Sequence, residues 1–453
     1  ADRYEHLFAP GFRQELMERE TAASGLSYIN TKASFLKLNL YLIIDEYDNF
    51  TNVILSEHGQ RMFHDLTHAS GFYREYFKQF KGMFDRIFMM GVSPVTLDGL
   101  SSGYNIDWNI SVDEIFNAMM GFEEAEVREM FRYYQQNDML KGDVEAMITE
   151  MKPWYDNYCF ARMSLNDDRV FNCDMTLYYL NYQVQRGSSP EEMVDKNIRT
   201  DYSKLKMLAR IDRDSVQEGD RMSTIEKIAA EGDIFVDLHT SFPAERITDI
   251  DNFRSLLYYY GLLTMCGTRG DLIKMSIPNN CVREQYFGFL RDYYQKYSSI
   301  DLHYLNVMLT DMAYDGRWKP FFESVAQAYR ENSAVRDAME GERNLQGFLK
   351  AYLALASYYL VEPELEMNYG YCDFFLLPDK KRYPDVKHSY ILELKYATRT
   401  ATDAELEVQA LEGRKQLLRY SEDKIVRCLS EGTTLHRLLL QFRGWDLVRC
   451  EEV

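Results

Sequence analysis

Two short apolar runs separated by a helical stretch constrain the fold of this 453-residue chain more than any other feature. Residues Leu40–Ile44 are rich in strand formers, and Arg86–Gly91 form a second apolar run that is followed by a Ser-Pro turn. Runs of this kind are typical of strands buried on both faces. Residues 58–82 between them have helical spacing. We therefore expect a βαβ unit and a parallel sheet in an α/β fold.

The middle of the chain, residues 111–335, is mostly helical by the spacing of its apolar residues. One hairpin is also expected, with its turn at Gly267–Asp271. Before the first apolar run, only Gly11–Glu20 has an amphipathic pattern, and Thr21–Ser34 has no recognisable period. The expected helices of the middle region are Val112–Met120, Glu124–Asn137, Asp174–Arg186, Ile250–Cys266 and Asn280–Lys296.

A compact module with an α-β-β-β-α order is expected in the last part of the chain. The chain therefore divides into three predicted regions, an α/β part at 1–110, a helical part at 111–335 and this module at 336–453. The elements expected in the module are a helix at Leu345–Leu360, strands at Glu364–Asn368, Tyr371–Leu377 and Ser389–Tyr396, and a helix at Thr402–Tyr420.

The net charge of −19 argues against a protein that coats nucleic acid without sequence preference, because such binding depends on clustered lysine and arginine. The charge is unevenly distributed, however. Residues 340–453 hold 16 basic and 19 acidic side chains, a net charge of −3, whereas residues 1–339 carry −16. If one part of the chain approaches a polyanion, it is the last region.

The cysteines and the apolar stretches indicate a cytoplasmic protein without a membrane span. The seven cysteines are scattered and contain no CxxC pair, which argues against a disulfide framework and a thiolate zinc site. The longest apolar stretches, 256–265 and 352–361, have about half of the ~20 residues that a transmembrane helix needs. No secretory leader begins at Ala1, and the absence of an initiating methionine suggests a processed or excised chain.

The residues that most strongly indicate chemistry are Asp373, Glu393 and Lys395. Side chains alternate along a strand, so Glu393 and Lys395 project from the same face of the expected strand. A charged pair among Ile, Leu and Tyr is costly to bury without a partner, which Asp373 on the neighbouring strand can supply. Two nearby carboxylates form an oxygen site suited to Mg²⁺. The metal would lower the pKa of a bound water, and the lysine would hold or polarise that water.

The order Asp–x19–Glu–x–Lys, after a helix opened by an acid and before a helix that carries a glutamine, resembles the PD-(D/E)xK nuclease superfamily. The resemblance covers about 110 residues. The proline that often precedes the aspartate is absent, and a cysteine stands before it. The alternative is a structural salt bridge of the lysine with one of the two acids on an edge strand. The resemblance implies metal ligands at Asp373 and Glu393, a catalytic lysine at Lys395, an accessory acid at Glu342, and orienting groups at Gln409 and Tyr420.

Residues Leu40–Asn49 resemble the Walker B strand of a P-loop ATPase, in which an apolar run presents an aspartate to Mg²⁺ and a glutamate to water. The resemblance implies nucleotide-binding roles for Asp45 and Glu46, and for Ser93 as a polar sensor residue after the second strand. No Gly-Lys dipeptide occurs in the sequence, so it contains no Walker A loop to cradle phosphates. The alternative is a core strand with a solvated acidic end.

Five segments together closely resemble a bacterial family that fuses an AAA-ATPase-like domain to a C-terminal PD-(D/E)xK nuclease-like domain. The resemblance begins at Leu38 and implies a P-loop-NTPase-like parallel sheet, a helical middle region and an α-β-β-β-α nuclease-like domain. Members of that family start with a Walker A strand and loop, which we expect upstream of Ala1. Either this segment was lost or removed, or residues 1–38 are joined to one another across segments that are absent from the sequence. The five segments are 43–49, 91–106, 119–121, 154–160 and 391–396.

The sequence thus favours a Mg²⁺-dependent nuclease that hydrolyses phosphodiester bonds and contacts DNA or RNA transiently, joined to a degenerate ATPase-like domain. Support for ATP binding by this chain is weak, because it lacks a Walker A loop. One alternative is a regulatory or interaction protein in which both sites have decayed, and metal titration distinguishes it from the nuclease. A second alternative is an NTPase whose P-loop lies outside this chain, which the sequence upstream of Ala1 would reveal.

Overall fold

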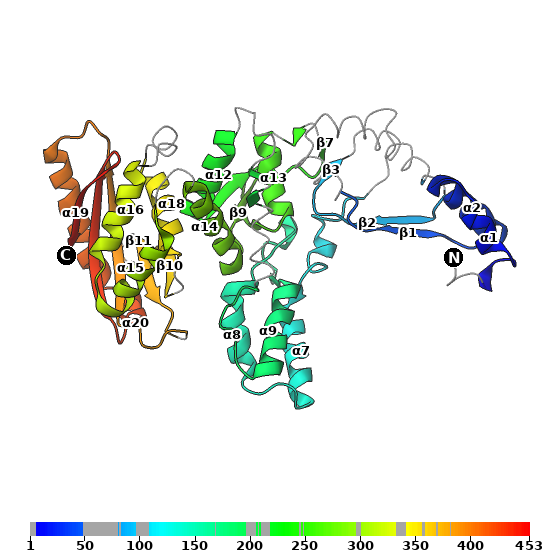
Figure 1. The fold of residues 1–453 in the computed structure, drawn as a ribbon, viewed down its shortest axis with the longest axis horizontal. Coiled ribbons are helices and arrows are strands. Elements are labelled where there is room, and N and C mark those ends of the chain that lie inside the picture. Colours follow the sequence, from blue (N-terminus) through cyan, green and yellow to red (C-terminus); the bar gives the residue numbers. More distant parts are fainter. Residues whose placement is uncertain are drawn as a thin grey trace. The chain divides into compact units, whose positions relative to one another are not determined.

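The structure is a computed structural model in which the chain forms two compact units, each described here by itself (Figure 1). The first unit comprises Ala1–Asp113, Met207–Glu218 and Asp237–Gly261, and the second comprises Glu114–Lys206, Gly219–Val236 and Leu262–Val453. The residues that the structure describes are 6–48, 80, 83–96, 108–167, 169–195, 205–206, 208–209, 218–243, 246–247, 249–295, 300–331, 341–355, 358–367, 370–380 and 382–453.

The first unit opens with two helices, of which the sequence pattern predicted only one. Helix α1 (Phe12–Met17) lies within the predicted amphipathic stretch. Helix α2 (Ala22–Phe35) begins with a capping box, in which the Thr21 hydroxyl accepts a hydrogen bond from the Ser24 amide at 3.1 Å. Its buried residues are only Gly25 and Ala33. A helix that buries so small a face leaves no apolar period in the sequence, which explains why it was not predicted.

The two apolar runs form strands β1 (Tyr41–Ile44) and β2 (Arg86–Met89), which pair in parallel as predicted. The expectation that both faces are buried is wrong for β1, because Tyr41 is 65% exposed and Ile43 is 69% exposed. Within the described residues this sheet has two strands, so the larger P-loop-like sheet stays a prediction. The helix expected at 58–82 lies outside the described residues, apart from Phe80.

Two of the predicted helices are shorter in the structure than expected. Helix α13 of the first unit ends at Tyr259 and spans Ile250–Tyr259, well before the predicted Cys266. Gly261 then adopts a left-handed φ of 70°, which a helix cannot continue through. The helix predicted at Val112–Met120 is a 3-10 turn, η2 (Glu114–Phe116). The first unit also holds a parallel pair of short strands, β3 (Val95–Thr96) and β7 (Phe242–Pro243).

The middle part of the second unit is built from helices, as predicted. Its elements are β4 (Phe122–Glu123), α7 (Glu124–Gln136), α8 (Val144–Tyr155), η3 (Arg162–Ser164), β5 (Val170–Phe171), α9 (Cys173–Arg186), α12 (Glu218–Glu231) and α14 (Asn280–Gln295). Strands β4 and β5 pair in an antiparallel manner beside Gly121, where a Cβ atom would lie 2.6 Å from the Val170 side chain. The predicted hairpin is present as β8 (Thr264–Arg269) and β9 (Leu272–Ser276), with β6 (Asp233–Val236) pairing to β9.

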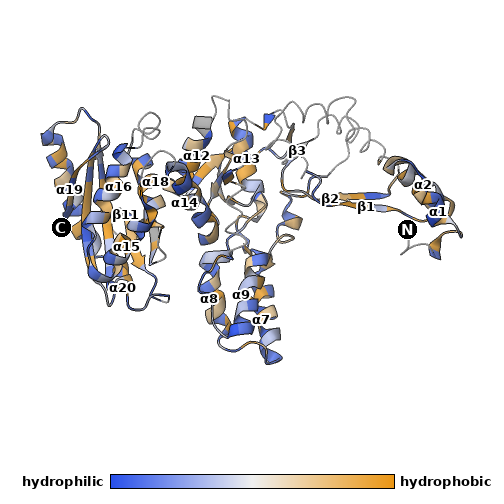
Figure 2. Cartoon of the chain, viewed as in Figure 1, coloured by the Kyte–Doolittle hydropathy of each residue, from blue (hydrophilic) through white to orange (hydrophobic). Residues whose placement is uncertain are grey.

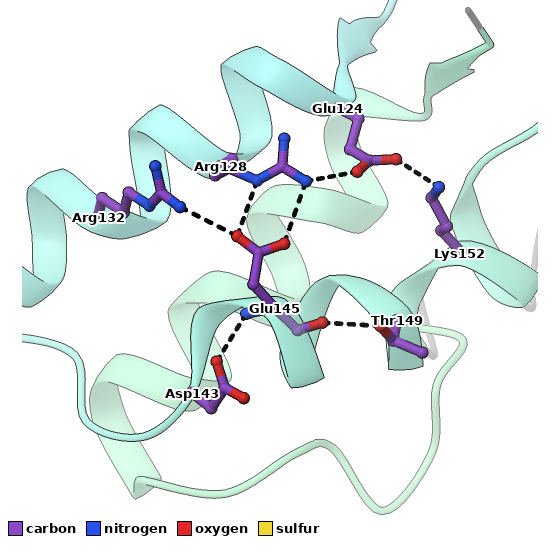
Figure 3. Close-up of polar contacts among 7 residues, drawn as sticks. All are labelled: Glu124, Arg128, Arg132, Asp143, Glu145, Thr149 and Lys152. Carbon is purple, nitrogen blue, oxygen red and sulfur yellow. Dashed lines mark hydrogen bonds and ion pairs between the residues drawn. The ribbon is translucent and has the colours of Figure 1, made fainter.

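A cluster of charged side chains joins α7 to α8 (Figure 3). The Arg128 guanidinium contacts Glu145 at 2.8 and 3.1 Å and Glu124 at 2.5 Å. Arg132 adds a contact of 3.1 Å to Glu145, and Lys152 pairs with the other oxygen of Glu124. All five side chains are partly exposed, so each pair contributes little stability by itself. The apolar core beneath them, which includes Phe131 and Tyr179, supplies most of the packing. The cluster therefore acts mainly to orient the two helices.

A buried carboxyl group, Glu226, lies where α12 packs against α14 and α18 (Glu342–Leu353). The Tyr294 hydroxyl donates to Glu226 Oε1 at 2.9 Å. The backbone of α12 closely approaches α18, because a Cβ atom at Gly347 would lie 3.5 Å from the Glu226 carbonyl oxygen. Burial raises the pKa of Glu226 to about 7, and the hydrogen bond from Tyr294 opposes this shift.

The raised pKa of Glu226 makes the stability of the second unit pH-dependent. Its ordinary pKa is 4.5, so the folded chain holds the proton more tightly and stability falls as the pH rises from about 4.5 to about 7. A Glu226→Gln variant keeps the acceptor oxygen and loses the charge. Chemical denaturation is expected to show the variant stabilised relative to wild type by about 2–3 kcal/mol more at pH 8 than at pH 4. An equal difference at both pH values would contradict this.

The C-terminal part of the second unit is a five-stranded mixed sheet, with helices packed against it (Figure 1). The strand order is β10-β11-β12-β13-β14, in which β12 and β13 run parallel and the other neighbours antiparallel. Figure 2 shows that these strands are largely hydrophobic, as expected for a buried sheet. The elements are α15 (Leu302–Asp315), α16 (Lys319–Glu331), α18, β10 (Tyr359–Met367), β11 (Gly370–Pro378), β12 (His388–Ala397), α19 (Asp403–Ser421), α20 (Lys424–Leu429), β13 (Thr434–Arg443) and β14 (Asp446–Glu452).

The predicted α-β-β-β-α order describes only the first part of this region. The helix expected at Leu345–Leu360 ends at Leu353, because Tyr359 and Leu360 already belong to β10. The next two strands and the helix after them lie where predicted. Strands β13 and β14 were not predicted, and they complete the sheet beyond β12. None of the described helices combines the length and the apolar composition that a membrane span requires.

Candidate active site

The candidate site begins where strand β11 separates from strand β12. The two strands pair from Leu376↔Tyr390 to Phe374↔Leu392, and the pairing ends just before Asp373. There the Leu394 amide donates to Asp373 Oδ2 at 2.7 Å, so a side chain replaces the backbone partner. The Asp373 carboxylate is therefore held where the backbone pairing of the two strands ends.

Helix α18 fixes the other oxygen of this carboxylate. The amide nitrogen Nε2 of Gln346 donates to Asp373 Oδ1 at 3.3 Å. Glu342 and Lys350 lie four residues before and four residues after Gln346, which places all three on one face of α18. The structure therefore brings the predicted accessory acid Glu342 near Asp373, and the buried Lys350 as well.

Glu393 and Lys395 lie on the same face of β12, as the strand alternation predicted, and they form the ion pair that the alternative of a structural salt bridge also expects. Lys395 Nζ donates to Glu393 Oε1 at 2.7 Å. Glu393 is buried, whereas Lys395 is partly exposed. The second oxygen of Glu393, Oε2, is buried and has no hydrogen-bond partner among the described residues. A buried carboxylate oxygen without a partner is costly, so this atom indicates a missing ligand.

The pKa values of Asp373 and Glu393 are both raised above their ordinary values. Burial raises the pKa of Asp373, and the nearby charge of Glu342 adds to this, while the Leu394 amide and Lys395 oppose it. Burial also raises the pKa of Glu393, with a further contribution from the charge of Asp373, and Lys395 opposes the shift. The site thus combines three acids, Asp373, Glu393 and Glu342, with two lysines, Lys395 and Lys350, so the acidic groups exceed the basic groups by one. A bound cation would relieve this excess.

These residues fit a Mg²⁺ ion held mainly by water. Mg²⁺ is usually bound through one or two carboxylates and keeps several of its waters. Asp373 and Glu393 supply two carboxylates, and Glu393 Oε2 has no competing partner in the described chain. No group of three or more His, Cys, Asp or Glu side chains suited to a metal occurs in the part of the chain that the structure describes. Water and substrate would therefore complete the coordination.

One face of helix α19 covers the ion pair. A Cβ atom at Gly413 would lie 3.4 Å from Lys395 Cε and 3.6 Å from Glu393 Cγ. Tyr420, two turns later on the same face, is buried, which raises the pKa of its hydroxyl to about 12 with a contribution from the charge of Glu393. Gln416 lies between them, and its Oε1 is buried without a hydrogen-bond partner among the described residues. The site-facing residues of α19 are thus spaced three and four apart.

The predicted orienting residue Gln409 lies one turn before Gly413 on the same face of α19, and its hydrogen bonds go to neighbours of the ion pair. Its Nε2 donates to the Tyr396 carbonyl at 3.3 Å, and its Oε1 accepts from Gln441 Nε2 at 3.4 Å. Gln409 therefore contacts the end of β12 and the neighbouring strand β13. Sequence reasoning missed Gln416 and Gly413. The signal that could have found them is the spacing of Gly413, Gln416 and Tyr420 on one helix face.

The candidate nucleotide-binding residues of the first unit lie at the ends of β1 and β2. Asp45 Oδ1 accepts from the Glu46 amide at 2.9 Å, and Glu46 has a left-handed φ of 51°. Asp48, which sequence reasoning missed, is buried and accepts from the Val92 amide at 3.1 Å and the Ser93 amide at 2.6 Å. Ser93 Oγ is buried without a hydrogen-bond partner among the described residues. Asp48 therefore holds the two strand ends together.

Comparison with known families matches two parts of the chain. Residues 340–452 match the PD-(D/E)XK nuclease superfamily, and residues 2–101 match a family described as a predicted AAA-ATPase. Both matches agree with the fusion that the sequence resembles. No curated protein matches the chain.

Proposed function

Because the chain joins an AAA-ATPase-like domain to a PD-(D/E)XK nuclease domain, we propose that it is a metal-dependent nuclease that hydrolyses phosphodiester bonds. The observation that carries this proposal is the arrangement of Asp373, Glu393 and Lys395. The buried carboxyl group of Glu393 and the half-buried one of Asp373 lie on neighbouring strands, one oxygen of Glu393 has no partner among the described residues, and a lysine borders them. A structural salt bridge alone does not account for the unpaired buried oxygen of Glu393.

In the proposed mechanism, Asp373 and Glu393 would hold Mg²⁺. When bound, the metal lowers the pKa of a coordinated water and offsets charge on the phosphate. The Leu394 amide and Gln346 keep the Asp373 carboxylate in one orientation. Lys395 donates one described hydrogen bond, to Glu393, and an ammonium group has three N–H donors. Lys395 would use the others to orient the attacking water or a phosphate oxygen as the P–O bond breaks.

For the N-terminal domain we propose an ATPase-like fold that does not hydrolyse ATP with the residues of this chain alone. The absence of a Gly-Lys dipeptide from the sequence supports this, because phosphates are usually cradled by a loop that ends in Gly-Lys. Asp45 also engages the neighbouring Glu46 amide. The domain is then a regulatory or assembly element for the nuclease.

The proposed nuclease activity is tested with single- and double-stranded DNA and with RNA, in Mg²⁺, in Mn²⁺ and in EDTA. Wild type is expected to cleave at least one substrate in a metal-dependent manner. Asp373→Ala and Lys395→Ala are each expected to lower the rate by about a thousandfold, because each removes charge from the reacting centre. Lys387→Ala, at an exposed position in the loop before β12, is the matched control and should leave the rate unchanged.

Two outcomes would contradict the nuclease assignment. One is retained cleavage in both variants with circular dichroism unchanged. The other is an absence of Mg²⁺ and Mn²⁺ binding that depends on Asp373 and Glu393, measured by calorimetric titration. The second result would favour a regulatory or interaction protein whose nuclease site has decayed.

A further inference from the structure

Helix α19 has two different faces, and only one of them is used within the chain. The inner face packs on β12 and β13 and covers the candidate active site. The residues buried on that face are Leu406, Ala410, Gly413, Leu417 and Tyr420. The outer face carries apolar side chains that are exposed in the structure. Val408 is 68% exposed, Leu411 is 52% exposed and Leu418 is 47% exposed.

The outer face has the spacing of a helix that packs along another helix. The residues along the centre of this face form a stripe and are alternately four and three positions apart. This is the heptad spacing of helices that pair with one another. Apolar residues dominate the stripe, and the long aliphatic part of Lys415 can cover apolar surface too. The stripe consists of Ala404, Val408, Leu411, Lys415, Leu418 and Glu422.

The charges beside this stripe are separated along the helix. Glu405 lies near its start and Glu412 at its middle, Lys415 and Arg419 lie in its second half, and Glu422 follows at the C-cap. All five are exposed. The described ion pairs of α19 involve other residues of the helix, such as Glu407 with Arg449 and Arg414 with Glu451. A partner helix that complements this face needs basic residues opposite the acidic part of α19 and acidic residues opposite its basic part.

We propose that the outer face of α19 binds the same face of a second copy of this chain, as an antiparallel helix pair. A reversed copy of α19 presents its basic part to the acidic part and its acidic part to the basic part, which is the required complementarity. Pairing about Gly413 sets Val408 opposite Leu418 and Leu411 opposite Lys415 of the second copy. Such a contact is isologous, because the same patch is used on both subunits.

This interaction surface is independent of the proposed nuclease activity. The inner face of α19 contacts the candidate site, so the dimer would place two copies of that site on opposite sides of one helix pair. A single pair of helices makes a small interface, so the dissociation constant is expected to be on the order of 10 µM.

The test measures self-association of the full chain by sedimentation velocity between about 1 and 100 µM. Wild type is expected to form dimers across this range. Leu411→Arg is expected to weaken dimerisation at least about tenfold, because it removes an apolar contact and opposes Lys415 of the second copy. The matched control is Leu177→Arg, which changes an exposed leucine on helix α9 and should leave dimerisation unchanged.

A charge exchange tests the antiparallel arrangement. Lys415→Glu alone is expected to weaken the dimer, since it places acidic groups near Glu412 of the second copy. The double variant Lys415→Glu with Glu412→Lys is expected to restore dimerisation, because complementary charges again face each other. A wild-type chain that stays monomeric at 100 µM would overturn the proposal and indicate that another protein covers this face. Dimers unaffected by Leu411→Arg, or a double variant as weak as the single one, would also overturn it.

Discussion

A Glu393→Gln variant is expected to lose metal-dependent cleavage and, at the same time, to be more stable than the wild-type chain without metal. In wild type, burial raises the pKa of Glu393, and Asp373 adds to the shift, so the ionised form is held at a cost to folding. Glutamine removes the charge but keeps an oxygen that can accept from Lys395. Active sites often show this trade-off between activity and stability, because the groups that bind a ligand destabilise the fold when the ligand is absent.

The expected gain for Glu393→Gln is about 1–3 kcal/mol in the free energy of unfolding at pH 8 in EDTA. Mn²⁺ should then reverse the order, because it stabilises wild type by binding the folded state and has lost a ligand in the variant. Thermal denaturation with and without Mn²⁺ measures both effects. Glu407→Gln, an exposed acid on α19, is the control for a general effect of charge removal. A variant that is destabilised in EDTA would show that Glu393 serves mainly as the partner of Lys395.

Gly413→Ala is expected to lower the cleavage rate about ten- to hundredfold, although alanine is the better helix former. The added Cβ atom would lie 2.7 Å from Leu439 Cδ1, in a packed core, and 3.4 Å from Lys395 Cε. Either Leu439 or the helix must move, and a shift of α19 displaces the residues that cover the ion pair. The cost in stability is about 1–3 kcal/mol before the gain in helix propensity.

The matched comparison for Gly413→Ala is Gly25→Ala on helix α2. There the added Cβ atom meets only Leu16 Cδ1, at 3.6 Å, which is an ordinary contact. The same substitution is therefore expected to leave cleavage unchanged and to stabilise α2 by about 0.5–1 kcal/mol. Cleavage rates and hydrogen exchange of the two helices measure these effects. If Gly413→Ala behaves like Gly25→Ala, the close packing of α19 on the ion pair is not needed for activity.

Much of the candidate site could be predicted because its key residues are related by local rules. Glu393 and Lys395 are two residues apart on a strand, so they share a face whatever the rest of the fold does. Asp373 was assigned to the neighbouring strand, and the structure places it against the Leu394 amide. Gln409 shows the limit of this reasoning. It lies one turn before Gly413 on the same face of the helix, but its side chain donates to the Tyr396 carbonyl at the end of β12 and not to the ion pair.

The errors in the fold have related causes. The expectation that β1 is buried on both faces came from its apolar residues, and apolar composition does not report whether a neighbour covers each face. Helix α2 was missed because it buries little. Strands β13 and β14 were not among the predicted elements of the module, and the pairing of β13 with β12 joins segments that are distant in the sequence.

The sequence by itself determined the alternation that sets Glu393 beside Lys395, the helical spacing of most helices, and the near-neutral charge of the last region. These properties depend on backbone geometry over a few residues. Only the tertiary structure decided that the pairing of β11 with β12 ends just before Asp373, that Gly413 packs against the ion pair while Gln409 bonds to the Tyr396 carbonyl, and that Glu393 Oε2 is left without a partner among the described residues. Each of these depends on how elements far apart in the sequence cross and pack, which no local pattern contains.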